Sequence, residues 1–138
     1  MGNQFLSNIR SCNAICHVVR AFDDPNVQHV DEKHDPKSDI EIINTELVLA
    51  DLQTLQKVVP RMDKEARANP KLRPEVDLLS SAQKILDSGQ PLWTSPDHTV
   101  TPLTTNYQLL TTKPVIYMFN VDEATLTEIG RASCRERV

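Results

Sequence analysis

Residues 113–123 read Lys113-Pro-Val-Ile-Tyr-Met-Phe-Asn-Val-Asp-Glu123. The apolar run at residues 115–119 is rich in β-branched and aromatic side chains, which predicts a buried strand. The run ends abruptly in a polar segment at residues 120–123, after which the pattern becomes helical. A buried parallel strand that ends in this way delivers a polar loop to the carboxyl edge of a sheet, where α/β proteins bind ligands. The stretch therefore predicts an α/β fold with a ligand-binding loop at residues 120–123.

A second buried strand is predicted at residues 14–19, Ala-Ile-Cys-His-Val-Val, because this segment is also apolar and β-branched. A short helical stretch at residues 4–10 precedes it. The two predicted strands are separated by about ninety residues whose pattern is mainly helical. We therefore expect a helical insertion into an α/β sheet.

The insertion begins with a long helix. Asp-Pro pairs at 24–25 and 35–36 signal turns, and residues 36–39 can cap a helix that begins near Ile40. Pro60 removes a backbone donor inside this helix, so we expect a kink or a break there. Apolar side chains recur at alternating steps of four and three, the spacing of a seam between paired helices: Val48, Leu52, Leu55, Val59, Met62 and Ala66.

A second helix is predicted to return along the first, giving a long antiparallel helical hairpin. Residues 68–74 contain an Asn and two prolines and form the tip, and the returning helix spans residues 75–88. Gly89 follows in the position that a helix C-cap favours. A short helix at residues 101–111 then leads into the last strand. The apolar side of the returning helix consists of Leu78, Leu79, Ala82, Ile85 and Leu86.

Composition limits the function classes. The chain has 138 residues, 39% of them hydrophobic and 4% aromatic, and a formal net charge of −4, so bulk charge does not indicate a nucleic-acid or membrane surface. No apolar run is long enough for a membrane span, and no signal peptide is visible. The three cysteines form no disulfide framework, as expected in a reducing compartment. These features predict a cytoplasmic protein that does not contact a membrane.

The last eleven residues, 128–138, read Glu-Ile-Gly-Arg-Ala-Ser-Cys-Arg-Glu-Arg-Val. The segment drops the helical pattern without a cap and resembles the conceptual translation of a common sequencing adapter. We expect it to be a sequencing artefact and leave it out of the fold prediction. A natural basic tail is the alternative.

Two groups of residues are candidate binding sites. Asn120, Val121 and Glu123 lie in the predicted ligand loop, although an Asn followed three residues later by a Glu also resembles a helix capping box. The second group is basic and can contact a polyanion, or form an ordinary solvated helix face: Lys57, Arg61, Lys64, Arg67, Lys71 and Arg73. A metal site is not expected, because the spacing of the cysteines and histidines does not match common zinc motifs. Those residues are Cys12, Cys16, His17, His29 and His34.

The phosphate-binding parts of a nucleotide hydrolase are missing from this sequence. A phosphate-binding loop of the form Gly-x-x-x-x-Gly-Lys-Ser/Thr needs two glycines five residues apart, but the chain has only Gly2, Gly89 and Gly130. No Asp-x-x-Gly occurs either. Catalytic residues, the phosphate cradle and magnesium ligands are therefore not expected within these 138 residues.

The sequence nevertheless resembles the YchF family, also called Obg-like ATPases, a branch of the Obg-type P-loop GTPases. The matching segments are residues 2–6, 14–22, 29–30, 35–36, 39–47, 49–51, 111–115 and 120–123. GTPases of this superfamily carry Asn-Lys-x-Asp in their base-reading loop, whereas this chain has Asn-x-x-Glu at residues 120–123.

The resemblance implies that the chain is an internal fragment of a longer protein with a P-loop G domain, an inserted helical hairpin and a C-terminal TGS domain. The implied division is a G-domain segment after the second switch region at residues 1–22 and the hairpin with its return helix at 23–112. The base-reading strand and loop follow at 113–127, and the artefact at 128–138. The resemblance further implies hydrolysis of ATP in preference to GTP, a requirement for Mg²⁺, and association with the ribosome or its RNA. The fragment alone should be inactive. The alternative is a small helical-hairpin module that binds RNA or protein without catalysis.

Overall fold

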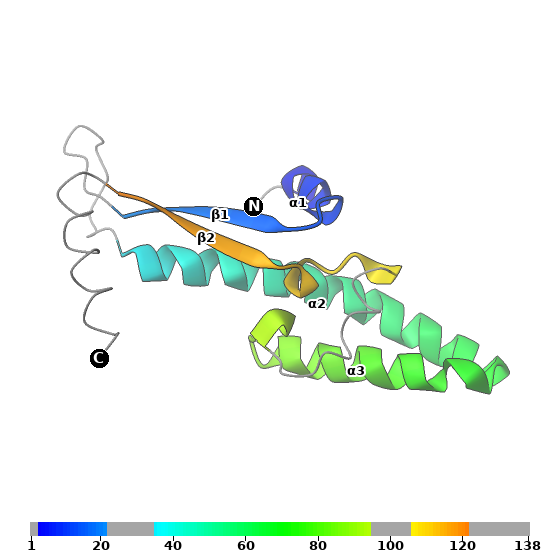
Figure 1. Ribbon diagram of the computed structural model, residues 1–138. Helices are drawn as coiled ribbons and strands as arrows, with labels where there is room; N and C mark the ends of the chain where they lie inside the picture. The colour runs from blue at the N-terminus through cyan, green and yellow to red at the C-terminus, as the bar shows by residue number, and fades with distance from the viewer. Residues whose placement is uncertain (1–2, 22–34, 95–105, 122–138) are drawn as a thin grey trace, which may run out of the picture.

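The computed structural model describes residues 3–21, 35–94 and 106–121 (Figure 1). Within these ranges no helix is both long and apolar enough to cross a membrane. The turn predicted at residues 24–25 and the segment 128–138 lie outside the described residues. The elements follow in the order α1 (Asn3–Arg10), β1 (Ile15–Arg20), α2 (Pro36–Ala68), η1 (Pro70–Leu72), α3 (Arg73–Asp87), η2 (Leu92–Thr94), η4 (Leu110–Thr112) and β2 (Val115–Asn120).

The strands β1 and β2 form a two-stranded parallel sheet, which confirms both predicted strands. Their register runs from Ile15 opposite Val115 to Arg20 opposite Asn120. The α2 helix runs along this sheet, and its Asn44 side chain hydrogen bonds to Tyr117 of β2 at 3.3 Å (Figure 1).

The prediction that both strands are buried is wrong. In the two strands Val19 alone is buried, while Val18, Ile116 and Met118 are 60%, 61% and 54% exposed. Successive side chains of a strand point to opposite faces, so these three exposed side chains share one face. No described element covers that face. An apolar run cannot reveal by itself whether one face or both are covered.

The α2 helix begins at Pro36, four residues before the predicted start. The Asp35 carboxylate accepts a hydrogen bond from the Lys37 amide at 3.1 Å, and a proline suits the first position of a helix. The helix then continues through Pro60 to Ala68, so it is not split there. Buried residues on both sides of Pro60 belong to one hydrophobic cluster. Packing of this kind stabilises a helix more than intrinsic propensity does.

The α3 helix packs along α2 and the two helices share the main hydrophobic core (Figure 1). Gly89 has a φ of +80°, and its amide donates to Leu86 O at 2.9 Å while the Gln90 amide donates to Ile85 O at 3.3 Å. This is a Schellman motif, which confirms the predicted C-cap. The predicted seam is also confirmed, with Leu52 and Val59 at its half-buried margin. The buried cluster comprises Val48, Leu55, Met62, Ala66, Val76, Leu79, Ala82, Leu86, Leu92 and Leu109.

The short helix predicted at residues 101–111 is not continuous. Residues 101–105 lie outside the described chain, residues 106–107 are helical, and Gln108 has a φ of +50°. Leu109 is extended, and the separate 3-10 turn η4 follows. A helix through residue 111 would need the amides of Leu110 and Thr111, but the carboxylate of Asp51 accepts hydrogen bonds from both of them.

Candidate functional site

The candidate base-binding loop begins at the carboxyl edge of the sheet. Because β1 and β2 are parallel, both strands end at this edge, with Arg20 opposite Asn120. The Ala21 amide donates to Asn120 O at 2.8 Å, which fixes the backbone at the end of β2. The Asn120 side chain is exposed and Val121 is half-buried. Glu123 lies outside the described residues, so neither its base contact nor the capping box is tested.

The six basic candidates do not form one uniform patch. Three arginines are paired with carboxylates: Arg61 with Glu65 at 3.5 Å, Arg67 with Asp63 at 3.0 Å, and Arg73 with Asp63 at 3.1 Å and Asp77 at 3.4 Å. These surface ion pairs reduce the positive charge that the arginines present, although each contributes little stability.

The three lysines of this set are exposed and have no ion-pair partner among the described residues: Lys57, Lys64 and Lys71. Lys64 and Lys71 lie near the tip formed by η1, whereas Lys57 lines a surface hollow together with Leu6 and Arg10 of α1. The tip and the ends of the strands lie at opposite ends of the molecule (Figure 1). A polyanion at the tip and a ligand at the strand ends would therefore occupy separate sites.

A buried polar junction lies between these two ends. Asp51 of α2 is 0% exposed, and its carboxylate accepts hydrogen bonds from Leu110 N at 2.9 Å, Thr111 N at 2.7 Å and Thr111 Oγ1 at 2.8 Å. The guanidinium of Arg10, at the end of α1, lies 3.6 Å from the same carboxylate. Burial raises the pKa of Asp51, while the hydrogen bonds from Thr111 and Leu110 and the charge of Arg10 oppose that rise.

Arg10 and Lys113 extend the junction. Arg10 donates to Gln108 O at 3.1 Å, to Ala50 O at 3.4 Å and to Thr54 Oγ1 at 3.2 Å. Lys113 is 4% exposed, and its ammonium donates to Arg10 O at 3.0 Å and also to Cys12 O. These contacts tie α1, α2 and the entrance of β2 together.

The sequence prediction did not assign a role to this junction. The sequence does indicate that Asp51 is buried. It lies three residues after Val48 and four before Leu55, and therefore on the apolar seam of α2. A charged residue on a buried seam requires a partner. That partner lies some sixty residues further along the chain, and helical spacing does not identify it.

A second junction joins α3 to the segment before β2. The Tyr107 hydroxyl donates to Glu75 Oε1 at 2.8 Å. Burial and the adjacent Glu75 carboxylate raise the pKa of Tyr107 to about 12. Tyr107 therefore stays protonated at neutral pH and remains a hydrogen-bond donor.

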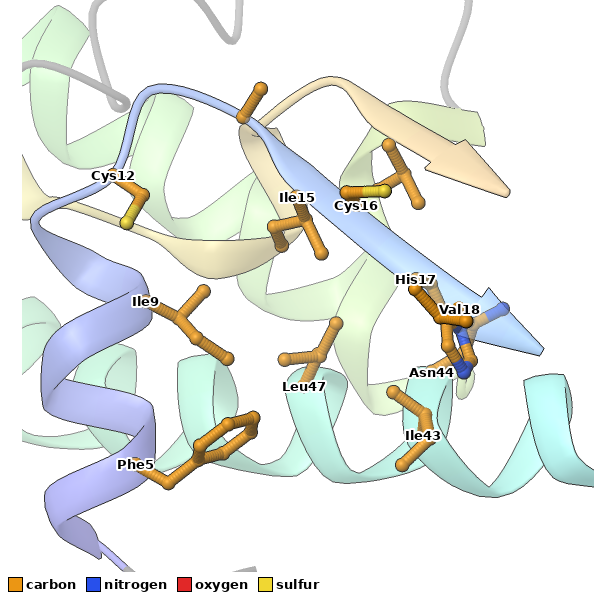
Figure 2. Close-up of a pocket in the computed structure, with 12 residues that line it drawn as sticks. Phe5, Ile9, Cys12, Ile15, Cys16, His17, Val18, Ile43, Asn44 and Leu47 are labelled. Atoms are coloured by element: carbon orange, nitrogen blue, oxygen red, sulfur yellow. The ribbon is translucent and has the colours of Figure 1, made fainter. Parts of the chain in front are cut away.

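An apolar hollow of about 520 Å³ lies between α1, β1 and α2. Figure 2 shows Phe5 and Ile9 of α1 facing Ile15 of β1 and Leu47 of α2. At one end His17 lies near Asn44, and the rings of His17 and Tyr117 are 5.7 Å apart. The hollow runs along β1, which within the described sheet pairs with β2 on one side only.

The side chains that the structure describes do not form a magnesium site. In the described ranges no three His, Cys, Asp or Glu side chains gather closely enough to hold a metal ion. Cys12 and Cys16 are both free and exposed, and His29 and His34 lie outside the described residues. The sequence also lacks the phosphate-binding loop whose Ser or Thr would hold Mg²⁺ beside a nucleotide. No magnesium-dependent step is therefore assigned to these side chains.

No family model matches the chain, but individual proteins of known sequence and structure do. The Ribosome-binding ATPase YchF of Bacillus subtilis is 44% identical over 141 aligned residues, which cover 100% of this chain and 37% of that protein. Obg-like ATPase 1 of Saccharomyces cerevisiae is 39% identical and covers 89% of this chain and 33% of that protein.

Comparison of the structure with solved structures finds a relative with the same name. The YchF GTPase of Schizosaccharomyces pombe superimposes with a TM-score of 0.79 at 32% identity, covering 93% of this chain and 36% of that structure. The chain thus spans about a third of the length of the relatives that it matches. Sequence identity across the chain and a matching structure together show that it belongs to the YchF, or Obg-like ATPase, family.

Proposed function

We propose that this chain is the part of a ribosome-associated nucleotide hydrolase that carries the base-reading loop and an antiparallel helical arm, formed by α2 and α3, and that it does not hydrolyse nucleotide by itself. The relatives are named as an ATPase that binds the ribosome and as a GTPase, which supports a nucleotide hydrolase.

The observation that carries the proposal is the uncovered apolar face of the sheet. Val18, Ile116 and Met118 are each more than half exposed on that face. Parallel sheets occur almost only where both faces are covered, because their strands are apolar on both sides. Two parallel strands with one bare apolar face therefore suit a segment of a larger α/β domain. A self-contained hairpin module would not need this face.

Asn120 is our candidate for reading the base. It occupies the end of a parallel strand, the edge at which α/β proteins bind ligands, and its exposed carboxamide can both donate and accept hydrogen bonds. Those groups match N7 and the N6 amine of adenine, the same pair that Asn reads in DNA.

Val121 and Glu123 account for the preference for ATP over GTP that we propose. In a loop of the Asn-Lys-x-Asp type, the Asp carboxylate accepts bonds from guanine N1–H and its N2 amine, neither of which adenine offers. Glu123 is one methylene longer than Asp, which moves its carboxylate away from that geometry. Val121 replaces the Lys whose stem packs on the base. A polar site that loses its matched partners discriminates less strongly.

The tip of the arm is our candidate for ribosome contact. Lys64 and Lys71 project from the tip without a carboxylate partner among the described residues. Unpaired lysines can release counterions from a phosphate backbone, whereas the paired arginines have already lost part of their attraction. The surface therefore offers two tip lysines rather than six equivalent cations.

Hydrolysis assays test the proposal directly. Purified 138-residue chain and the full-length protein that contains it are each incubated with ATP and Mg²⁺, and phosphate release is measured. We expect release by the full-length protein and none above buffer by the chain, because base contacts alone cannot hold the phosphates. Magnesium-dependent hydrolysis by the purified chain would refute the proposal.

A further inference from the structure

Asp51 occupies a transition point on α2. On its N-terminal side, Asn44 and Leu47 line the hollow beside the sheet, and Asn44 bonds to Tyr117 of β2. From Val48 onwards, buried side chains of α2, Leu55 among them, belong to the hydrophobic cluster that α2 shares with α3. Asp51 therefore lies where the helix stops contacting the sheet and begins to form the arm.

At this point the junction contacts the segment that leads into β2. The carboxylate of Asp51 fixes two successive amides, those of Leu110 and Thr111, and Arg10 fixes the carbonyl of Gln108. Gln108 has a φ of +50°, a conformation that is unfavourable for a residue with a side chain. The hydrogen bond from Arg10 holds Gln108 in this conformation. Lys113, next to β2, adds a further hydrogen bond to the carbonyl of Arg10.

The strand then transmits this placement to its far end. The carbonyl of Pro114 accepts from the Ile15 amide at 2.9 Å, and six successive residue pairs follow in register up to Asn120. At about 3.3 Å per residue, β2 places Asn120 roughly 17 Å from Val115. A paired strand cannot absorb a shift at its entrance within its own length, because its hydrogen bonds fix the register.

We propose that Asp51, held by Arg10, is a positioning residue that sets the location of Asn120 against the nucleotide base. This inference rests on the proposed function, in which Asn120 reads the base. Asp51 does not touch the ligand and acts only through the entrance of β2. Because Asp51 belongs to the helix that forms the arm, the same contact links the arm to the base-reading loop.

The test separates positioning of the base from general loss of structure. In the full-length protein, Asp51→Asn keeps the size of the side chain but turns an amide donor towards the donor groups of Leu110, Thr111 and Arg10. Binding of ATP is compared with binding of inorganic tripolyphosphate, which offers the phosphates without a base, both with Mg²⁺. We expect the affinity for ATP to fall about tenfold, the change that the loss of one hydrogen bond to the base produces. The affinity for tripolyphosphate should stay within about twofold, because that ligand makes no base contact.

Two further variants make the result decisive. Thr111→Val removes one of the three hydrogen bonds to Asp51 with little change in shape, and it should weaken ATP binding in the same selective way, though less. Glu41→Gln removes an exposed carboxylate from the same helix and should leave both affinities unchanged. If Asp51→Asn and Thr111→Val lower both affinities equally, or neither, the positioning role is refuted. Wild-type protein that binds tripolyphosphate but shows no additional affinity for ATP refutes the proposed base site itself.

Discussion

Replacement of Leu55 by Ala should cost far more stability than the same replacement at Leu49, although both residues lie on α2. Leu55 is 0% exposed and belongs to the cluster between α2 and α3, whereas Leu49 is 48% exposed. The two changes remove the same atoms from the same helix, so helix propensity cancels in the comparison. What remains is the difference in burial.

The magnitudes follow from that difference. A fully buried Leu loses its transfer free energy and also leaves a cavity, which together cost about 3–5 kcal/mol. A half-exposed Leu has only about half of its area buried, and its removal leaves no closed cavity. A cost of about 1 kcal/mol or less is therefore expected. Because the free energy of unfolding of a small domain is only about 5–15 kcal/mol, the first change should be near the limit that the fold tolerates.

Urea unfolding of the purified chain, followed by far-ultraviolet circular dichroism, measures both free energies of unfolding. Equal midpoints for Leu55→Ala and Leu49→Ala, with equal slopes, would show that the arm is not held by the core described above. A cost below about 1 kcal/mol for Leu55→Ala would have the same meaning.

Three other changes test the remaining sites. Burial raises the pKa of Asp51 above its ordinary value of 3.8, so this carboxyl stabilises the fold fully below that pH and loses the contribution as the pH rises through its folded pKa. Urea midpoints should therefore favour wild type over Asp51→Asn increasingly as the pH is lowered towards 3.8, and a difference that is independent of pH contradicts this. In the full-length protein, Val121→Lys combined with Glu123→Asp should shift competition binding towards GTP; an unchanged ratio means that the base is read elsewhere. Charge reversal at Lys64 and Lys71 should weaken co-sedimentation of the full-length protein with ribosomes and lower its salt slope by about two. Sedimentation like wild type at every salt concentration would leave the tip as a solvated face.

The helices and strands were predictable because their signals are local. The alternating steps of four and three on α2 and the glycine after α3 follow from helix geometry, and both are confirmed. The start of α2 was predicted four residues late, because Asp35 rather than residues 36–39 provides the cap.

What could not be predicted depends on contacts between distant segments. The carboxylate of Asp51 accepts hydrogen bonds from two amides that a helix at residues 101–111 would have used. A contact about sixty residues away in the chain therefore overrides the local helical pattern. The exposure of Ile116 and Met118 depends on which elements cover the sheet, and strand composition does not report that. For the same reason, charge counting suggested six similar cations at the arm, whereas ion pairs divide them into paired arginines and unpaired lysines.

The pairing of β1 with β2 has a consequence for the order of folding. Ile15 and Val115 are neighbours in the sheet although one hundred positions separate them in the chain. Closing a disordered loop of that length costs about 4 kcal/mol in chain entropy, whereas α2 and α3 make contacts across a short tip. We therefore expect the two helices to associate first and to shorten the loop that the strands must close. The sheet should form late, and its amides should become protected from hydrogen exchange after those of the arm.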